Sequence, residues 1–181
     1  MSVDFRNSLL WFPVAALSVP AYAVDYFTIA EAQKMLFPSA QQFLVNDIEF
    51  SDDDKDKIKD LAGVRQRHDK QPVWKAQANG EQIGWFIVDD VVGKHEYITY
   101  GLAIDMQGKV IGLEIMSYRE THGSEVRRQN WRDQFVGKQV NEEFALDEDI
   151  QNISGATLSC RNLTDGVKRL LVIHQMALAK L

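Results

Sequence analysis

Residues 72–92 read PVWKAQANGEQIGWFIVDDVV, and this stretch decides the fold class of the protein. It contains two runs rich in Val, Ile, Trp and Phe, Pro72–Ala78 and Gln82–Val92, on either side of Asn79-Gly80. Asn and Gly both tolerate the positive φ that a two-residue hairpin turn requires. The dipeptide between two β-type runs therefore predicts a pair of antiparallel strands.

A second pair of β-type runs follows directly along the chain. Tyr97–Met106 and Lys109–Tyr118 flank Gln107-Gly108 in the same arrangement. Consecutive strands joined by short turns form an antiparallel meander, so we expect one sheet of this kind in the middle of the chain.

Helices are predicted on both sides of the meander. Thr28-Ile29-Ala30-Glu31 has the form of a capping box, which opens a short helix running toward Phe37. Ser51 and the three aspartates after it open a second helix, which Gly63 ends. From Arg161 onward the pattern is one long amphipathic helix, with an apolar stripe formed by Leu163, Val167, Leu170, Leu171, Leu178 and Leu181. The predicted fold class is α+β, with helices packed against one antiparallel sheet.

The composition of the 181 residues is that of a soluble globular domain, with 45% hydrophobic and 25% charged residues. A net charge of −6 without a long Lys/Arg block argues against a nucleic-acid-binding surface. The acidic run Asp52–Asp54 lacks the glycine and the terminal Glu of a calcium loop, so no metal site is assigned. The only cysteine, Cys160, excludes an internal disulfide, and we expect it to be a small buried residue.

Residues 1–23 have the features of a secretory signal peptide. Arg6 precedes an apolar run, and Ala21-Tyr22-Ala23 fits the small-x-small rule for cleavage. The apolar run is short for a bilayer span and contains two prolines. We therefore predict export and a mature chain that begins at Val24, with an uncleaved membrane anchor as the alternative.

The stretch Ile153–Cys160, ISGATLSC, places three hydroxyl groups and a thiol at the start of the closing helix. A helix cap needs only one hydroxyl. A hydrolase would need an activated nucleophile, but the sequence contains no G-x-S-x-G motif. Phosphate binding has a better physical basis, because the N–H groups of a helix start attract an anion and the small Gly155 and Ala156 let it approach. From these residues alone, simple capping by the hydroxyls stays open.

Ser154-Gly155-Ala156-Thr157 resembles the S/T-G-A-T motif of the FMN-binding domain family. Two further elements are similar to motifs of that family and occur in the family order. Arg119–Glu125, RETHGSE, follows a predicted strand as the family's E-T-P-G-L-G does, and Gln134–Lys138, QFVGK, is similar to its Q-F-x-G-K. Three ordered elements are more specific than one tetrapeptide. They assign residues 84–181 to the core of an FMN-binding domain, with residues 24–83 as an N-terminal helical segment and first strands of the same domain.

The resemblance implies that FMN is the cofactor and that the Thr157 hydroxyl carries it through a phosphoester, which a flavin transferase installs. It also implies a periplasmic electron carrier that exchanges electrons with a membrane or periplasmic redox protein, rather than a stand-alone enzyme. No catalytic residue is assigned, because the flavin does the redox chemistry. The expected FMN-binding residues are Ser154, Gly155, Ala156, Thr157, Leu158 and Ser159 at the helix start, and Glu120, Thr121, His122 and Gly123 in the loop after the strand.

The chain departs from the family motifs at several positions. Gln151 stands where the family often has Asp, three residues before the S-G-A-T motif. In the second element His122 replaces Pro, and Ser124 and Glu125 replace Leu and Gly. These departures favour an alternative function, a flavin-free scaffold or partner-binding module that keeps the fold.

Overall fold

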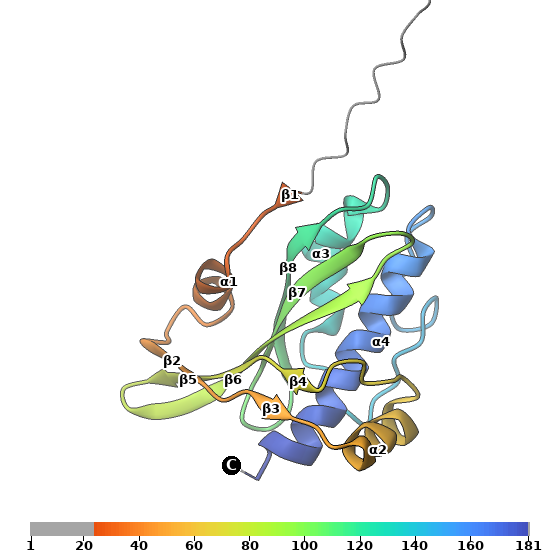
Figure 1. Ribbon diagram of the computed structural model, residues 1–181. Helices are drawn as coiled ribbons and strands as arrows, with labels where there is room; N and C mark the ends of the chain where they lie inside the picture. Colours follow the sequence, from red (N-terminus) through yellow and green to blue (C-terminus); the bar gives the residue numbers. More distant parts are fainter. Residues whose placement is uncertain (1–23, 181) are drawn as a thin grey trace, which may run out of the picture.

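The computed structural model describes residues 24–180, so the predicted signal peptide lies outside the described residues. The described chain forms a six-stranded antiparallel sheet with the strand order β1-β8-β7-β6-β5-β2, shown in Figure 1. Its strands are β1 (Val24–Asp25), β2 (Gln42–Val45), β5 (Val73–Ala78), β6 (Glu81–Val92), β7 (Tyr97–Ile104) and β8 (Val110–Tyr118). A separate short ribbon pairs β3 (Ile48–Glu49) with β4 (Lys70–Gln71). The predicted meander is thus confirmed as β5 to β8, and β1 and β2 extend it at both edges.

The two predicted hairpins are present, but their turns are built differently. In the β5–β6 turn, Asn79 and Gly80 have φ values of 53° and 81°, as a two-residue turn requires. The β7–β8 turn is longer, and the Asp105 carboxylate accepts the N–H groups of Gln107 at 2.8 Å and Lys109 at 2.9 Å. The Asp105 side chain therefore shapes the second turn through its bonds to nearby backbone N–H groups, and the Gln107-Gly108 dipeptide does not form it alone.

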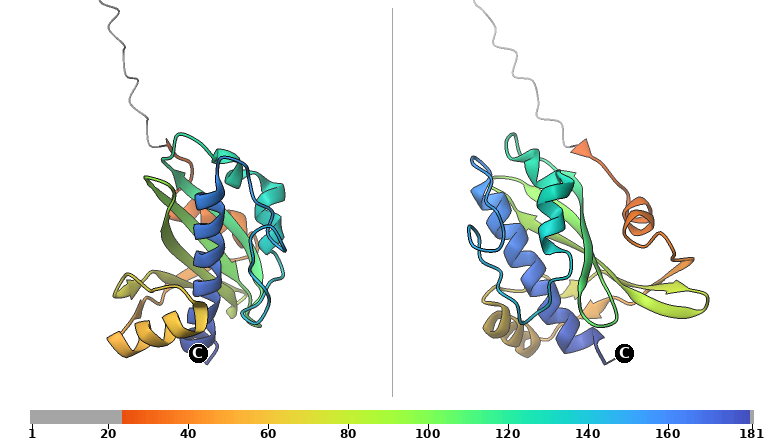
Figure 2. Two further views of the ribbon diagram at one scale, coloured as in Figure 1. Left: turned by 90° about the vertical axis from the view of Figure 1, so that its right-hand side faces the viewer. Right: turned by 180° about the vertical axis from the view of Figure 1, so that it is seen from behind.

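Helices cover both faces of the sheet, as the two views in Figure 2 show. On one face lies α4 (Thr157–Ile173), which continues as the π-helical turn η3 (His174–Leu178), and α2 (Asp52–Ala62) packs against it. On the other face, α1 (Ile29–Leu36) contacts β7 and β8. The connection from β8 to α4 contains η1 (Ser124–Arg127), α3 (Gln129–Arg132) and η2 (Asp133–Phe135). Within residues 24–180, no helix combines the length and the apolar character needed to cross a membrane.

The predicted ends of α1 and α2 are confirmed. At α1, the Thr28 hydroxyl accepts the N–H of Glu31 at 3.3 Å, and the Glu31 carboxylate accepts the N–H of Thr28 at 2.8 Å. Ser51 caps α2 in the same way, and Gly63 ends it in the left-handed conformation with φ 73°. These local signals set the helix boundaries because they satisfy backbone groups that no helical bond can reach.

Two clusters of buried side chains hold the layers together. The larger cluster lies between the sheet and α4 and contains five residues of the predicted stripe, Leu163, Val167, Leu170, Leu171 and Leu178. Leu181 lies outside the described residues. The smaller cluster lies beneath α1 and contains Ala32, Phe37, Ala76, Phe86, Ala103 and Met116. Each large side chain buried in this way contributes about 1.5–3 kcal/mol, so packing fixes α4 firmly against the sheet.

A buried charge pair adds to the contact between α4 and the sheet. The guanidinium of Arg169 on α4 bonds to the carboxylate of Asp89 on β6, and both residues are 4% exposed. The Tyr100 hydroxyl also donates to Asp89 at 2.8 Å, and Arg169 donates to the carbonyl of Arg65 at 3.1 Å. Polar groups at this depth need partners, and these bonds provide them.

Candidate functional site

One end of the sheet brings three separate segments together: the loop of residues 93–96 between β6 and β7, the segment that follows β8, and the start of α4 (Figure 1). Between them lies a cavity of about 270 Å³. It is lined by Lys94, His95, Glu120, Thr121, His122, Gly155, Ala156, Thr157, Leu158 and Ser159. The predicted site residues therefore meet in one place, except Ser154 and Gly123, which are not part of the lining.

The start of α4 differs from the predicted helix start. The helix begins at Thr157, four residues before the predicted Arg161, and its N-cap is Ala156. No hydroxyl in the stretch caps the helix, so simple capping is not their role. Within residues 24–180, the N–H groups of Thr157, Leu158 and Ser159 have no hydrogen-bond acceptor. Together they leave the positive end of a long helix available to an anion.

The hydroxyl groups of the stretch have different environments. Thr157 is half-buried, and its hydroxyl makes no hydrogen bond within the described part of the chain. Ser159 is buried, with its hydroxyl 3.3 Å from that of Tyr118, whose own proton goes to the carbonyl of His122 at 2.5 Å. Because a phenol has one proton, Ser159 is the donor to Tyr118. Ser159 and Tyr118 thus join the helix start to the loop after β8, while Ser154 is exposed.

Two small residues allow these segments to touch. Gly123 has φ 88°, and a Cβ atom added there would lie 2.6 Å from Cβ of Ala156 and 2.7 Å from the hydroxyl oxygen of Tyr118. Ala156 is itself 4% exposed, so its small size serves this contact. Gly155 has φ 83° and no atom within 4 Å of an added Cβ, so the backbone conformation is what requires glycine there.

Glu120 supports the loop on the other side of the cavity. Its carboxylate accepts the N–H groups of His95 at 2.5 Å and Glu96 at 2.9 Å. Partial burial opposes ionisation of Glu120, but these backbone N–H groups outweigh it and lower its pKa. Glu120 was predicted in the site, but Lys94 and His95, which its carboxylate helps to position, were not.

The third predicted element holds the segment that leads into Thr157. The Gln134 side chain accepts the N–H of Gln151 at 2.7 Å, and the indole N–H of Trp131 donates to the carbonyl of Gln151 at 2.7 Å. Lys138 forms an ion pair with Asp149. Trp131 is 3% exposed and belongs to the core, so it is not available to cover a flavin ring. The Q-F-x-G-K element therefore positions the stretch without lining the cavity.

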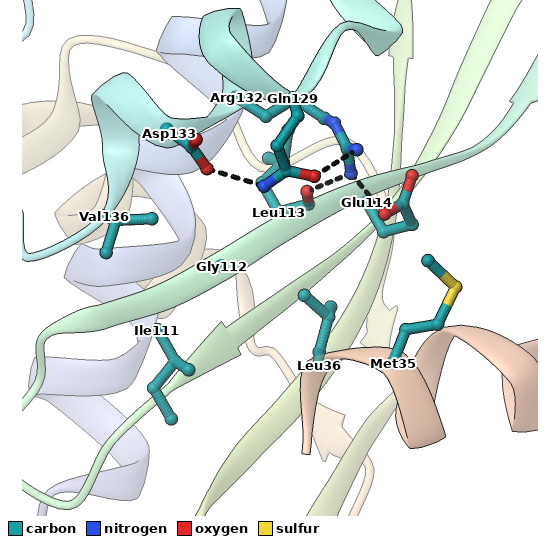
Figure 3. A pocket seen from close by; sticks show the side chains of 10 residues that line it. All are labelled: Met35, Leu36, Ile111, Gly112, Leu113, Glu114, Gln129, Arg132, Asp133 and Val136. Carbon is teal, nitrogen blue, oxygen red and sulfur yellow. Dashed lines mark hydrogen bonds and ion pairs between the residues drawn. The ribbon is translucent and has the colours of Figure 1, made fainter. Parts of the chain in front are cut away.

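A second cavity, of about 220 Å³, lies between α1, β8 and α3 (Figure 3). Its polar groups bond to one another: Arg132 pairs with Glu114 and donates to the carbonyl of Leu113 at 2.8 Å, and Gln129 donates to Asp133 at 2.6 Å. None of the predicted site residues lines it. The cavity at the start of α4 is therefore the candidate site.

A cavity that presents a threonine hydroxyl and unpaired helix-start N–H groups fits a phosphate group. The fold and the site thus define a binding module for a phosphate-bearing cofactor. Residues 93–172 match the model of the FMN-binding domain. The predicted resemblance and the predicted cofactor, FMN, are confirmed by this match.

Known relatives agree with the assignment. Over 194 residues the chain is 25% identical to a subunit of the Na⁺-translocating ferredoxin:NAD⁺ oxidoreductase complex of Acetobacterium woodii, covering 96% of this chain and 92% of the relative. It is 27% identical over 156 residues to a subunit of the proton-translocating ferredoxin:NAD⁺ oxidoreductase complex of Clostridium ljungdahlii, covering 81% and 77%. The crystal structure of NqrC from Shewanella oneidensis has the same fold, with a TM-score of 0.52 and 15% identity over 75% of this chain and 80% of that one.

Proposed function

We propose that this protein is a periplasmic electron-transfer flavoprotein whose FMN is attached through a phosphoester to Thr157. The observation that carries the proposal is the position of Thr157. It is the first residue of α4, it lines the cavity, and its hydroxyl has no other partner within the described residues. A phosphate bonded to this oxygen would meet the free N–H groups of the same helix turn.

The size of the cavity favours a covalent link. Its volume of about 270 Å³ is below the range of about 300–1,000 Å³ that is usual for pockets that enclose a ligand. FMN would be only partly buried there, and weak burial alone would let an exported carrier lose its cofactor by dilution. A covalent tether keeps the local flavin concentration high without tight non-covalent binding.

The bound isoalloxazine ring would supply the reversible redox chemistry, and the chain would hold it at an exposed end of the sheet. The relatives from Acetobacterium woodii and Clostridium ljungdahlii both belong to ferredoxin:NAD⁺ oxidoreductase complexes. We infer that this chain also belongs to an oxidoreductase complex and carries flavin there, with a membrane redox protein as its partner and a flavin transferase as a second partner during maturation. Export by residues 1–23 would place it in the periplasm, with cleavage expected after Ala23.

The test is denaturation-resistant flavin on protein produced together with a flavin transferase. Wild-type protein should show in-gel flavin fluorescence and the mass of one attached FMN, and Thr157→Val should show neither. Ser154→Ala and Cys160→Ala are matched controls that should keep the flavin, since Ser154 is outside the lining and Cys160 is fully buried. Fluorescence retained in Thr157→Val would disprove the attachment site. Colourless wild-type protein would instead support the flavin-free scaffold, which the unusual Gln151 and the altered loop favour.

A further inference from the structure

The candidate site contains a cation that the family motifs do not account for. Lys94 is the only lysine or arginine among the described residues that line the cavity. It is exposed and forms no salt bridge within residues 24–180. This unpaired positive charge lines the same cavity as the start of α4, in a chain whose net charge is −6.

The loop that carries Lys94 is held from two directions. On one side the Glu120 carboxylate accepts the N–H groups of His95 and Glu96. On the other side the Asn162 side chain, in the second turn of α4, donates to the carbonyl of Val92. The backbone on both sides of Lys94 is therefore fixed, once to the loop after β8 and once to the helix that begins at Thr157.

Close packing leaves little freedom at the start of this loop. Gly93 is buried, and a Cβ atom added there would lie 2.5 Å from a carboxylate oxygen of Glu120. The N–H of Gly93 also donates to the carbonyl of Glu96 at 2.8 Å, which closes the loop on itself. Lys94 is thus presented from a rigid turn, so the backbone of the loop need not be ordered when its side chain binds a ligand.

The charges around the cavity identify the chemical group that Lys94 would meet. The Glu120 carboxylate accepts backbone N–H groups of the loop, which stabilise its charge and engage it within the protein. The N–H groups at the start of α4 add partial positive charge, and the imidazoles of His95 and His122 line the same space. Of the parts of oxidised FMN, only the phosphate is anionic, so it is the group that these charges attract.

We propose that Lys94 binds the phosphate of FMN and makes the site selective for phosphorylated flavins over riboflavin. This inference rests on the proposed function, since the phosphate must lie near Thr157. Lys94 would act as a point charge on the phosphate, in addition to the N–H groups of the helix start.

Reversible binding to the Thr157→Val protein, which cannot form the phosphoester, tests this role. Dissociation constants for FMN and riboflavin are measured by flavin fluorescence with and without Lys94→Gln. Lys94→Gln should weaken FMN binding about fivefold to tenfold and leave riboflavin binding within about twofold, because only FMN offers a charged partner. Added salt should weaken FMN binding more in the parent than in the Lys94→Gln variant.

The matched control is Lys109→Gln in the same background. Lys109 is an exposed lysine in the β7–β8 turn, at the opposite end of the strands, and its loss should change neither constant. The inference is wrong if the ratio of the FMN and riboflavin dissociation constants is the same in the Lys94→Gln and Lys109→Gln variants. It is also wrong if the parent binds both flavins with equal affinity. If wild-type protein still carries covalent flavin in that case, only the role of Lys94 fails. If it carries none and the parent binds neither flavin, the proposed function fails as well.

Discussion

Lys138 and Asp149 form an ion pair that joins the end of the Gln134–Lys138 element to the segment leading into Thr157. The N–H of Ala145 also donates to Asp149, at 2.6 Å. Partial burial opposes ionisation of Asp149, but the Lys138 ammonium and the Ala145 N–H outweigh it, so the pKa of Asp149 lies below its ordinary value. The pair thus favours the folded state when Asp149 is charged.

This relationship predicts a pH-dependent effect of Lys138→Met. An Asp with a lowered pKa in the folded state stabilises fully above its unfolded pKa of about 3.9, and this contribution is lost as pH falls through the folded pKa. Lys138→Met should therefore lower the free energy of unfolding by about 1–2 kcal/mol at pH 7. The difference from wild type should shrink as urea melts are repeated below pH 4. Lys109→Met is the control, and a deficit that does not change with pH would show that Lys138 acts through packing alone.

Because Gly123 packs against Ala156, a larger residue at position 123 should destabilise the protein by steric crowding. Gly137 is a control that separates this crowding from the cost of the backbone conformation. Gly123 and Gly137 have nearly equal φ values, 88° and 86°, but an added Cβ is crowded only at Gly123. Gly137→Ala should show the cost of the left-handed backbone alone, about 1 kcal/mol, and Gly123→Ala should lose about 1–3 kcal/mol more. Thermal unfolding measures both losses, and Ala156→Gly should partly restore the Gly123→Ala variant. Equal losses in the two single variants would mean that the loop moves aside without strain.

The buried pair between Arg169 and Asp89 predicts non-additive substitutions. Arg169→Met leaves the carboxylate of Asp89 buried without its main partner, which should cost about 3–5 kcal/mol. Adding Asp89→Asn removes that charge, and its amide oxygen can still accept the bond from Tyr100. The double variant should therefore be more stable than Arg169→Met in chemical denaturation. A double variant less stable than either single variant would contradict the charge-based explanation.

Local signals were sufficient to predict much of this fold. The Thr28 and Ser51 caps, the Asn79-Gly80 turn and the Leu163-to-Leu178 stripe each act through near neighbours, so the sequence alone reveals them. The edge strands β1 and β2 were missed because they are short and depend on pairing with β8 and β5 far along the chain.

Two of the three segments that line the candidate site were predicted, because the loop after β8 and the start of α4 carry family motifs. The third segment, the β6–β7 loop, was missed. Lys94 and His95 belong to no motif, and their loop joins the site only through the sheet topology. A topological signal was nevertheless present. In an antiparallel meander every second connection falls at the same end, so the β6–β7 loop had to lie beside the segment after β8. The bonds of Glu120 to that loop depend on side-chain geometry, which spacing along the sequence does not reveal.

The length of α4 limits where electrons can enter and leave the carrier proposed above. The helix has 17 residues, which places its far end about 25 Å from Thr157. Electron tunnelling decays exponentially with distance, so a protein docked at that far end would exchange electrons with the flavin far too slowly. Donor and acceptor would have to use the same end of the molecule. Donor and acceptor could bind at this end one after the other. Alternatively, both could stay bound there, and the tethered flavin would move between them.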